Sequence, residues 1–387
     1  MADRVLITGA RAASALDLAR DFHAAGWEVH MADCTPARIS RWSRAVQRLH
    51  RYPSPVREPQ HFRQRVLDLV DQVQPRLILP TCEEAFHLAA PALQDRLDAC
   101  LFQPHLPRLR QLHDKHGFAL LLAELGLPVP ETHLITNKAD LARFAGDSSA
   151  WVFKPCFSRF GEAALIGPAP ARLHQIDILP GLPWIAQRKV TGMEASFYAV
   201  ARDGQVTAFA AYHSDWRLKG GASIAFAPLS PAQHAMLLGF ARRLAVHGAI
   251  SGQLACDVMI DAAGQAWLIE CNPRATSGVH FLAGQGDLAR AIAGTASEPA
   301  LAEPGQLHLL PAMLSFGLAN AIQRGRLKPW IAALRTGQDA IGRAGDRRPM
   351  LGALVDGCAF ALAGLRHGQS TSTMTTADIE WNGESLA

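Results

Sequence analysis

The sequence predicts an α/β protein that opens with a parallel sheet covered by helices. Residues 4–9 (RVLITG) are an apolar run ending in glycine, residues 14–25 carry apolar positions on one helical face, and residues 26–31 (GWEVHM) are typical of a second strand. A third strand at 76–80 (RLILP) leads into another helix. Because a helix between two strands returns the chain in the same direction, this order favours a parallel sheet.

The rest of the chain divides into a strand-rich middle and a helical end. A helix begins near residue 114, and Gly126 followed by two prolines ends it. Strands are then expected at 151–155, 184–187, 194–201, 205–212, 252–260 and 266–271, with a helix at 231–247. Beyond Ser297 the chain becomes Ala- and Leu-rich and helical, and a polar tail follows Gly368. Because one hydrophobic core stops growing at roughly 250–300 residues, this length predicts two or three domains.

Composition and charge argue against several classes of protein. Apolar residues make up 49% of the chain and charged residues 19%, as in ordinary folded proteins. The net charge of +4 gives little support to a nucleic-acid partner. Arginines are dense between residues 36 and 65, but those at 41, 44, 48 and 51 follow helical spacing, which favours a solvated helix face over an RNA-binding patch.

Cysteine usage and the apolar segments indicate a cytoplasmic protein. Seven cysteines without a CxxC pair or zinc-type spacing are expected to be reduced and mostly buried. No secretion signal precedes the strand-like run at Val5. Residues 350–365 are apolar, but they are shorter than the roughly 20 residues of a spanning helix and include Asp356, so we expect a packed core helix and no membrane span.

The first βα turn raises the question of a dinucleotide site. Residues 8–14 hold one glycine, Gly9, where the GxGxxG fingerprint has three. Asp33 follows the second strand, where an acid would bind a ribose. One glycine and one acid favour a structural Rossmann-like domain over an NAD site, and a nicotinamide-dependent reductase stays as an alternative.

We expect the chemistry in one hairpin. Asp257 lies on its first strand, and Glu270 and Asn272 lie on its second. Period-two alternation puts Glu270 and Asn272 on one face, and the antiparallel return can bring Asp257 opposite them. Cys271 alternates to the other face and is assigned to packing.

Two carboxylates on one face point to a bound cation. Placing them together in an apolar setting costs several kcal/mol unless a cation compensates, and an all-oxygen set suits Mg²⁺ bound through the phosphates of a nucleoside triphosphate. The alternative is a surface hairpin with solvated acids. The apolar residues Leu254, Val258, Trp267 and Ile269 disfavour it.

Residues 268–274 (LIECNPR) resemble the E-x-N-x-R strand of the ATP-grasp superfamily of ligases. The rest of that pattern follows in order across residues 114–282. The resemblance implies four parts: a Rossmann-like parallel-sheet domain at 1–105, linker helices and the ATP-grasp lid at 106–186, a catalytic lobe with an antiparallel sheet at 187–298, and a helical C-terminal region at 299–387. It also implies that Asp257, Glu270 and Asn272 hold Mg²⁺ beside ATP.

The resemblance assigns nucleotide contacts as well. Lys115, before the lid, and Lys154, on a lid strand, would contact the phosphates, and the loop at 156–162 would fold over them. The linker that holds adenine through its backbone corresponds to Gln187, Arg188, Lys189 and Val190, although an acid is common at the position of Arg188. Glu194 matches the acid that contacts the ribose or a group near it, with an exposed strand acid as the competing interpretation.

Two further segments concern the substrate. Residues 212–223 (YHSDWRLKGGAS) resemble the basic, glycine-containing segment that faces the acyl phosphate. Arg217 and Lys219 would then bind the carboxylate or the transferring phosphoryl group, and a solvated hairpin edge is the alternative. Arg274 would face the same centre. His280 follows in a loop that closes the pocket, as a general base or as a structural residue.

The resemblance thus implies an ATP- and Mg²⁺-dependent, ADP-forming ligase. It would activate a carboxylate as an acyl phosphate and transfer the acyl group to a nucleophile, most often an amine, forming a C–N bond. Its partners would be small-molecule substrates, without nucleic acid, and a homodimer stays open. A non-catalytic ATP-binding regulatory protein is a second alternative.

Overall fold

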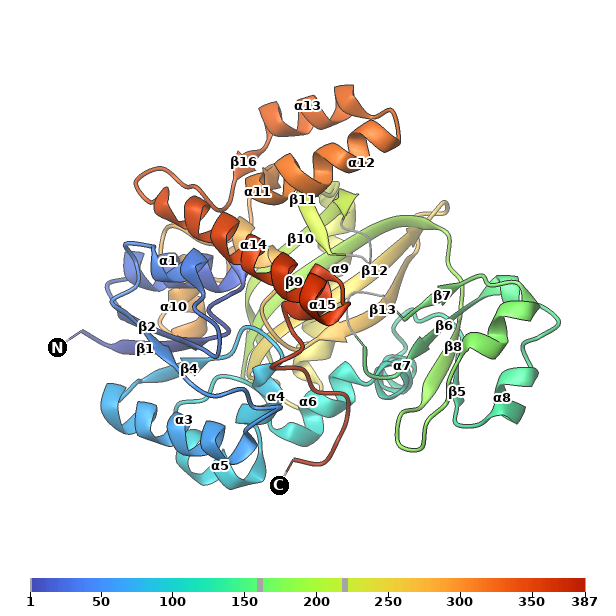
Figure 1. Cartoon of the computed structure of the whole chain (residues 1–387), viewed down its shortest axis with the longest axis horizontal. Helices are drawn as coiled ribbons and strands as arrows, with labels where there is room; N and C mark the ends of the chain where they lie inside the picture. The colour runs from blue at the N-terminus through green and yellow to red at the C-terminus, as the bar shows by residue number, and fades with distance from the viewer. Residues whose placement is uncertain (1, 159–162, 218–221, 387) are drawn as a thin grey trace.

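The computed structural model describes residues 2–158, 163–217 and 222–386 and confirms the predicted α/β class (Figure 1). Its first layer is a parallel sheet in the order β3-β2-β1-β4. The elements of this layer are β1 (Arg4–Thr8), α1 (Ala13–Ala24), β2 (Glu28–Asp33), α2 (Arg38–Arg41), β3 (Arg48–Arg51), α3 (Pro59–Val73), β4 (Leu77–Leu79), α4 (Glu84–Leu88) and α5 (Pro91–Leu97). The central strand β1 is apolar because it is buried between neighbouring strands and helices.

The arginine-rich segment does not form the predicted helix. The helix α2 has only four residues, and Arg48 and Arg51 lie on the strand β3. This strand pairs with β2, in a register that sets His30 beside Arg48 and Met31 beside Leu49. Hydrogen bonding along the edge of β2 outweighs the local helical spacing, which carries no information about a distant strand edge.

The middle of the chain forms a small antiparallel sheet, the lid sheet, in the order β5-β8-β6-β7. It follows the helices α6 (Leu106–His113) and α7 (Lys115–Glu124). Its elements are β5 (Thr132–Ile135), α8 (Lys138–Ala142), η1 (Ser148–Ala150), β6 (Trp151–Pro155), β7 (Leu165–Ile166), η2 (Pro170–Gln175) and β8 (Trp184–Arg188). Ile135, Phe153 and Ala186 are fully buried in its own core, so this sheet is stabilised separately from the N-terminal sheet.

The largest sheet follows the order β13-β12-β9-β10-β11-β15-β16, with β14 paired to β10. Its elements, with the covering helix, are β9 (Gly192–Arg202), β10 (Gln205–Arg217), β11 (Ser223–Pro228), α9 (Pro231–Val246), β12 (Gly252–Asp261), β13 (Ala266–Asn272), β14 (Ala300–Leu301), β15 (Leu307–His308) and β16 (Gln338–Asp339). Along β9, Phe197 packs with Leu237 of α9, whereas its neighbour Tyr198 packs with Val5 of the N-terminal sheet. Alternation along one strand therefore joins the large sheet to two separate cores.

The C-terminal region is mainly helical, as predicted, and its short strands extend the large sheet. Its remaining elements, with the two that precede it, are η3 (Ser277–Phe281), α10 (Asp287–Ala293), α11 (Leu310–Ala312), the π-helical turn Met313–Gly317, α12 (Leu318–Gln323), α13 (Leu327–Thr336), α14 (Arg348–His367) and α15 (Thr371–Met374). Figure 1 shows α12 and α13 projecting from the body of the molecule, while α14 lies across it.

The expectation that residues 350–365 form a packed core helix is wrong. The helix α14 turns small residues toward α2, since a Cβ at Gly352 would overlap the carbonyl group of Arg38, and the Asp356 carboxylate accepts a hydrogen bond from the Ile39 amide (2.9 Å). Its outer face is apolar and exposed, with Leu365 82% exposed. Among the described residues, α14 is the one helix long and apolar enough to cross a membrane.

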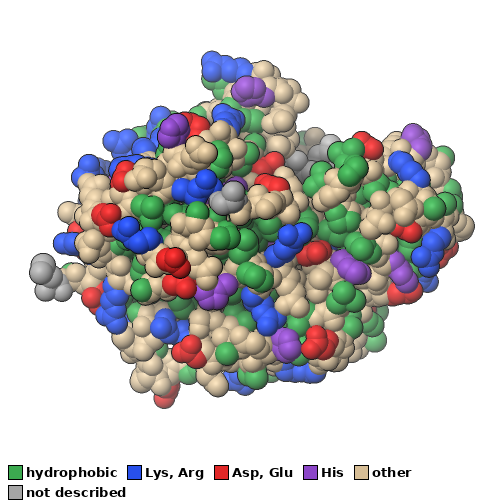
Figure 2. All heavy atoms as spheres, turned by 90° about the horizontal axis from the view of Figure 1, so that it is seen from below, with side chains coloured by type: hydrophobic (Ala, Val, Ile, Leu, Met, Phe, Trp, Pro, Cys, Tyr) green, Lys and Arg blue, Asp and Glu red, His purple; other side chains and the backbone are tan. Residues whose placement is uncertain are grey.

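Charges are mixed on the face shown in Figure 2. Lys and Arg side chains lie among Asp and Glu side chains, and apolar side chains separate them.

Two glycines of α14 give opposite predictions for stability. Gly352→Ala should lower the free energy of unfolding by about 1–3 kcal/mol, because its methyl group has no room beside Arg38. Gly357→Ala should leave it unchanged or raise it by up to about 1 kcal/mol, because a Cβ at Gly357 meets nothing within 4 Å and alanine favours a helix. Urea unfolding followed by circular dichroism measures both, and equal stabilities would contradict the packing of α14 on α2.

Candidate active site

The register of the β12–β13 hairpin brings the predicted metal ligands together. Asp257 lies directly opposite Glu270, and Ala255 lies opposite Asn272. Residues directly opposite in an antiparallel pair project to the same face, so the two carboxylates lie side by side. The pair between them, Cys256 and Cys271, is buried in the core on the other face, as predicted for Cys271.

Two lysines from different elements converge on this hairpin. Lys115 is the first residue of α7, and its Nζ lies 3.4 Å from Glu270 Oε2. The Nζ of Lys154, on the lid strand β6, lies 4.0 Å from the same oxygen. Both lysines are buried. Figure 1 shows the arrangement that allows this contact, with α7 between β13 and the lid strands β6 and β8.

Local bonds fix Lys115 in place. Asp114 caps α7 by accepting a hydrogen bond from the His116 amide (3.0 Å), so the helix begins at Lys115. The Lys115 amide donates to Cys156 O (3.1 Å), and its Nζ donates to Ser158 O (3.0 Å). The short segment 156–158 after β6 therefore holds both ends of this lysine.

The cluster shifts the pKa values of its members in opposite directions. Burial and the neighbouring charge of Glu270 raise the pKa of Asp257, although Ser196 Oγ donates a hydrogen bond to it (2.7 Å). Burial would also raise the pKa of Glu270, but the charges of Lys115 and Lys154 outweigh it and lower that pKa. Burial, assisted by the charge of Lys115, lowers the pKa of Lys154 to about 8.

These groups fit a magnesium ion. Asp257, Glu270 and Asn272 offer only oxygen donors, the type that Mg²⁺ prefers. Burial and the charge of Glu270 both raise the pKa of Asp257, and a bound cation would offset both effects. Across the described residues no cluster of three or more His, Cys, Asp or Glu side chains that could hold a metal ion is found.

Arg274 is held from the N-terminal layer. Its Nε lies 3.3 Å from Glu83 Oε1, and its Nη2 donates to Asn272 Oδ1 (3.3 Å). Glu83 directly precedes α4, beyond the carboxyl end of β4. The sequence analysis did not single out Glu83, although the carboxyl ends of parallel strands are where such sheets bind ligands, and this rule could have drawn attention to it.

Arg217 and Glu194, predicted for different ligands, pair with each other. Arg217 Nε lies 2.9 Å from Glu194 Oε2, across the neighbouring strands β10 and β9. The positive charge of Arg217 also lowers the pKa of Asp257, and so partly offsets the rise that burial and Glu270 cause. Lys219 and residues 159–162 of the loop after β6 lie outside the described residues, so their roles stay predictions.

The predicted adenine linker lies at the end of the lid strand β8. The Gln187 side chain is buried and donates to Thr132 Oγ1 (3.1 Å). The Arg188 guanidinium lies over the Trp151 ring, 5.1 Å from its centroid, and the Lys189 amide donates to Ala150 O (2.8 Å). Val190 follows directly after them. These contacts attach the linker to the lid, and its binding of adenine stays a prediction.

His280 is a structural residue in this arrangement. Its Nδ1 lies 2.8 Å from Asp17 Oδ2, and both side chains are almost completely buried. Arg343 Nη2 lies 2.7 Å from the same Asp17 oxygen. These contacts hold the imidazole from the N-terminal layer and favour the structural alternative for His280.

The geometry also disfavours a dinucleotide site in the N-terminal sheet. A Cβ at Gly9 would lie 2.5 Å from Thr81 Oγ1, so this glycine serves the contact between β1 and β4. Asp33 is fully buried and already accepts hydrogen bonds from Arg11 and Thr35. A carboxylate bound in this way is not presented to a ribose.

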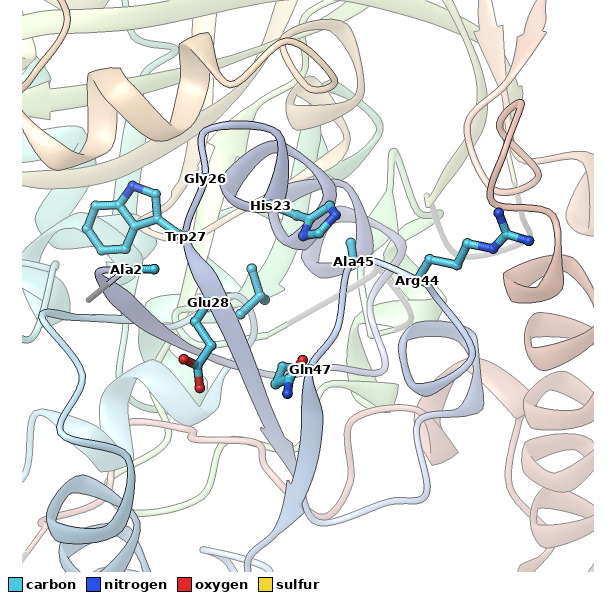
Figure 3. A pocket seen from close by; sticks show the side chains of 9 residues that line it. Ala2, His23, Gly26, Trp27, Glu28, Arg44, Ala45 and Gln47 are labelled. Carbon is cyan, nitrogen blue, oxygen red and sulfur yellow. The ribbon is translucent and has the colours of Figure 1, made fainter.

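A small surface hollow near the N-terminus lies elsewhere (Figure 3). His23, Trp27, Glu28 and Gln47 line it, around the start of β2. Open parallel sheets bind ligands beyond the carboxyl ends of their strands, so this hollow is at the wrong end of the sheet for a substrate.

Comparison with known proteins identifies the fold. No protein-family model matches the sequence. The chain is similar over most of its length to solved structures of ATP-grasp enzymes, and it has the ATP-grasp fold predicted above.

Three of these structures, which differ in the enzyme they represent, show how similar the chain is to this group. N5-carboxyaminoimidazole synthetase from Staphylococcus aureus is 15% identical, with a TM-score of 0.63 over 80% of this chain and 82% of that one. The biotin carboxylase domain of 2-oxoglutarate carboxylase from Hydrogenobacter thermophilus is 15% identical, with a TM-score of 0.61 over 79% and 73%. L-amino acid ligase from Bacillus licheniformis is 14% identical, with a TM-score of 0.60 over 80% of each chain.

The pKa of Lys154 provides a test of the cluster without any ligand. Since the carboxylate of Glu270 supports the charge of Lys154, Glu270→Gln should lower the pKa of Lys154 further below about 8. Nuclear magnetic resonance of ¹³C-dimethylated lysines measures this value, and Lys154→Arg assigns the signal. Glu124→Gln, at the exposed end of α7, is the matched control and should leave the pKa unchanged. An unchanged value in Glu270→Gln would contradict the predicted coupling.

Proposed function

We propose that this chain is an ATP- and Mg²⁺-dependent ligase that activates a small-molecule carboxylate as an acyl phosphate and passes the acyl group to an amine. The observation that carries the proposal is the charge cluster around Glu270, which lies opposite Asp257 and within 4.0 Å of two buried lysines. Two adjacent carboxylates repel each other in the free protein, and a divalent cation would relieve that repulsion. Buried lysines beside the cation fit the phosphates of a nucleotide.

Asp257, Glu270 and Asn272 would hold Mg²⁺. The ion would supply positive charge that offsets the negative charge developing during phosphoryl transfer. Ser196 would orient Asp257 through its hydrogen bond of 2.7 Å and leave the second carboxylate oxygen for the ion.

Lys115 and Lys154 would bind phosphate oxygens of ATP and exchange part of their contact with Glu270 for that interaction. In the transfer step, an oxygen of the substrate carboxylate forms a bond to the γ-phosphorus. The bond from that phosphorus to the β–γ bridging oxygen breaks, and ADP leaves with the electron pair. Two fixed ammonium groups stabilise this step because charge accumulates on the phosphate oxygens.

Arg274 would bind the substrate carboxylate and then the acyl phosphate, since its guanidinium is already oriented by Glu83 and Asn272. Arg217 and Lys219 are proposed to assist there. The amine nitrogen attacks the carbonyl carbon, the carbon–oxygen bond to phosphate breaks, and the amine gives up a proton. The products are an amide, ADP and phosphate.

The names of similar structures support this class of reaction. An N5-carboxyaminoimidazole synthetase structure is a complex with ADP, and the biotin carboxylase domain is a complex with MgADP and bicarbonate. The similar L-amino acid ligase and phosphoribosylamine–glycine ligase are named for forming bonds to amino acids. Each of them is similar in fold to this chain over 78–80% of its length, with TM-scores of 0.60–0.62.

The test is ADP release from Mg-ATP with a panel of carboxylates and amines. The wild-type protein is expected to release ADP only when an accepted carboxylate is present. Glu270→Gln should reduce turnover by about a thousandfold, because it removes a metal ligand and the partner of two lysines.

Glu124→Gln is again the control, because it neutralises an exposed carboxylate on α7 and should retain wild-type turnover. A turnover of Glu270→Gln equal to that of the wild type would contradict the proposed function. Binding of Mg-ATP without ADP release for any pair of substrates would instead favour the non-catalytic, ATP-binding alternative.

A further inference from the structure

The C-terminal segment runs across the N-terminal layer. After α15 the chain runs past α4 and α6 to its end (Figure 1). Arg11 Nη1 donates to Thr375 O (2.9 Å) and to the Asp378 carboxylate (2.5 Å), and Ser54 Oγ donates to Asp378 O (2.6 Å). The segment thus crosses the carboxyl end of the parallel sheet, and its path is fixed by hydrogen bonds to Arg11 and Ser54.

The segment is anchored by one tryptophan. The Trp381 side chain is only 1% exposed, and it stacks on Phe86 of α4 with ring centroids 4.6 Å apart. On another side its ring meets Phe157 edge to face at 5.3 Å. Gly383 lies against the same Phe157 ring with φ +93°, and a Cβ there would approach that ring to 2.6 Å. Trp381 therefore packs between the N-terminal layer and the segment that follows β6.

The two aromatic residues that contact Trp381 lie next to residues that hold the candidate active site. Phe157 lies between Cys156 and Ser158, whose carbonyl groups accept the two hydrogen bonds of Lys115 (3.1 and 3.0 Å). Phe86 lies on α4, and Glu83, at the start of that helix, holds Arg274 at 3.3 Å. The His87 ring, next to Phe86, also contacts Glu380 O at 3.1 Å. The Trp381 indole thus packs against both segments that hold the proposed ligand-binding residues. One segment holds Lys115, proposed to bind phosphate, and the other holds Arg274, proposed to bind the substrate.

We propose that Trp381 is a positioning residue of the active site, which locks segment 156–158 against α4 and so fixes Lys115 and Arg274 relative to Glu270. This inference rests on the proposed ligase function and adds to it a role for the C-terminal segment. The indole touches neither lysine nor arginine and acts through Phe157 and Phe86. Without it, the carbonyl groups that hold Lys115 lose their support, and the affinity for a nucleotide falls.

The test is the affinity of the full-length protein for Mg-ATP, measured by titration calorimetry. Two aromatic contacts are lost in Trp381→Ala, which should weaken binding by about tenfold. Trp381→Phe keeps an aromatic ring in the same place and should stay within about threefold of the wild type. Trp27→Ala removes an aromatic pair with Phe22 at the opposite end of the sheet and should bind like the wild type.

A second variant distinguishes a loss of positioning from a folding defect. Asp378→Asn weakens the attachment of the segment to Arg11 without removing a core side chain, since Arg11 keeps Asp33 at 2.6 Å. It should weaken binding in the same direction by about twofold or more. Circular dichroism and thermal unfolding establish that Trp381→Ala and Trp27→Ala are comparably folded.

The outcomes are distinct. Wild-type affinity in both Trp381→Ala and Asp378→Asn, with a wild-type protein that binds Mg-ATP, would overturn the role of Trp381 and leave the proposed function standing. Failure of Trp381→Phe to restore affinity would also overturn it. A wild-type protein that does not bind Mg-ATP would instead overturn the proposed function itself.

Discussion

The carboxylate of Glu270 is the contact on which the candidate site depends. It lies opposite Asp257, within 3.4 Å of Lys115 Nζ and 4.0 Å of Lys154 Nζ. A carboxylate beside another carboxylate is unfavourable unless positive charge compensates, and here two buried lysines provide it. Lys154 in turn keeps its charge more easily because Glu270 is near. The large sheet, the helix α7 and the lid strand β6 are therefore joined electrostatically at one oxygen atom, and a shift of any of these elements would expose an uncompensated charge.

The rest of the fold serves to hold these elements in register. The large sheet shares one core with α9 and another with the N-terminal sheet, so the hairpin is fixed on both faces. The lid sheet has its own core and meets the site through β6 and the segment 156–158. The N-terminal layer contributes Glu83, which orients Arg274 from a position 191 residues away in the chain. The N-terminal layer therefore helps to position a side chain of the candidate site. Its buried Asp33 forms a structural ion pair with Arg11.

The features that the sequence could predict are those set by local periodicity. Alternation along β13 puts Glu270 and Asn272 on one face and turns Cys271 into the core, which follows from a period of two. The register of the hairpin then sets Glu270 opposite Asp257. The failures have the opposite character. Helical spacing of arginines could not predict that the edge of β2 would take Arg48 and Arg51 into a strand, because that choice depends on a pairing with residues 18 positions away. The apolar pattern of α14 gave no sign that its small residues, Gly352 among them, would face inward. Glu83 was missed because its partner is fixed by tertiary packing alone.

Four cations of the site each have a protein carboxylate as a partner. Lys115 and Lys154 share Glu270, Arg217 pairs with Glu194, and Arg274 pairs with Glu83. A bound anion must compete with these carboxylates, so part of its attraction is lost at each contact. The compensation is that the cations are already oriented, and little reorganisation is required when charge develops on a transferring phosphoryl group. Such a site favours ligands that carry several negative charges at once, because one charge alone gains little by replacing a carboxylate already in place. A triphosphate with its metal ion meets that condition, and a single carboxylate does not, which predicts that the nucleotide binds before the substrate whose carboxylate Arg274 would receive.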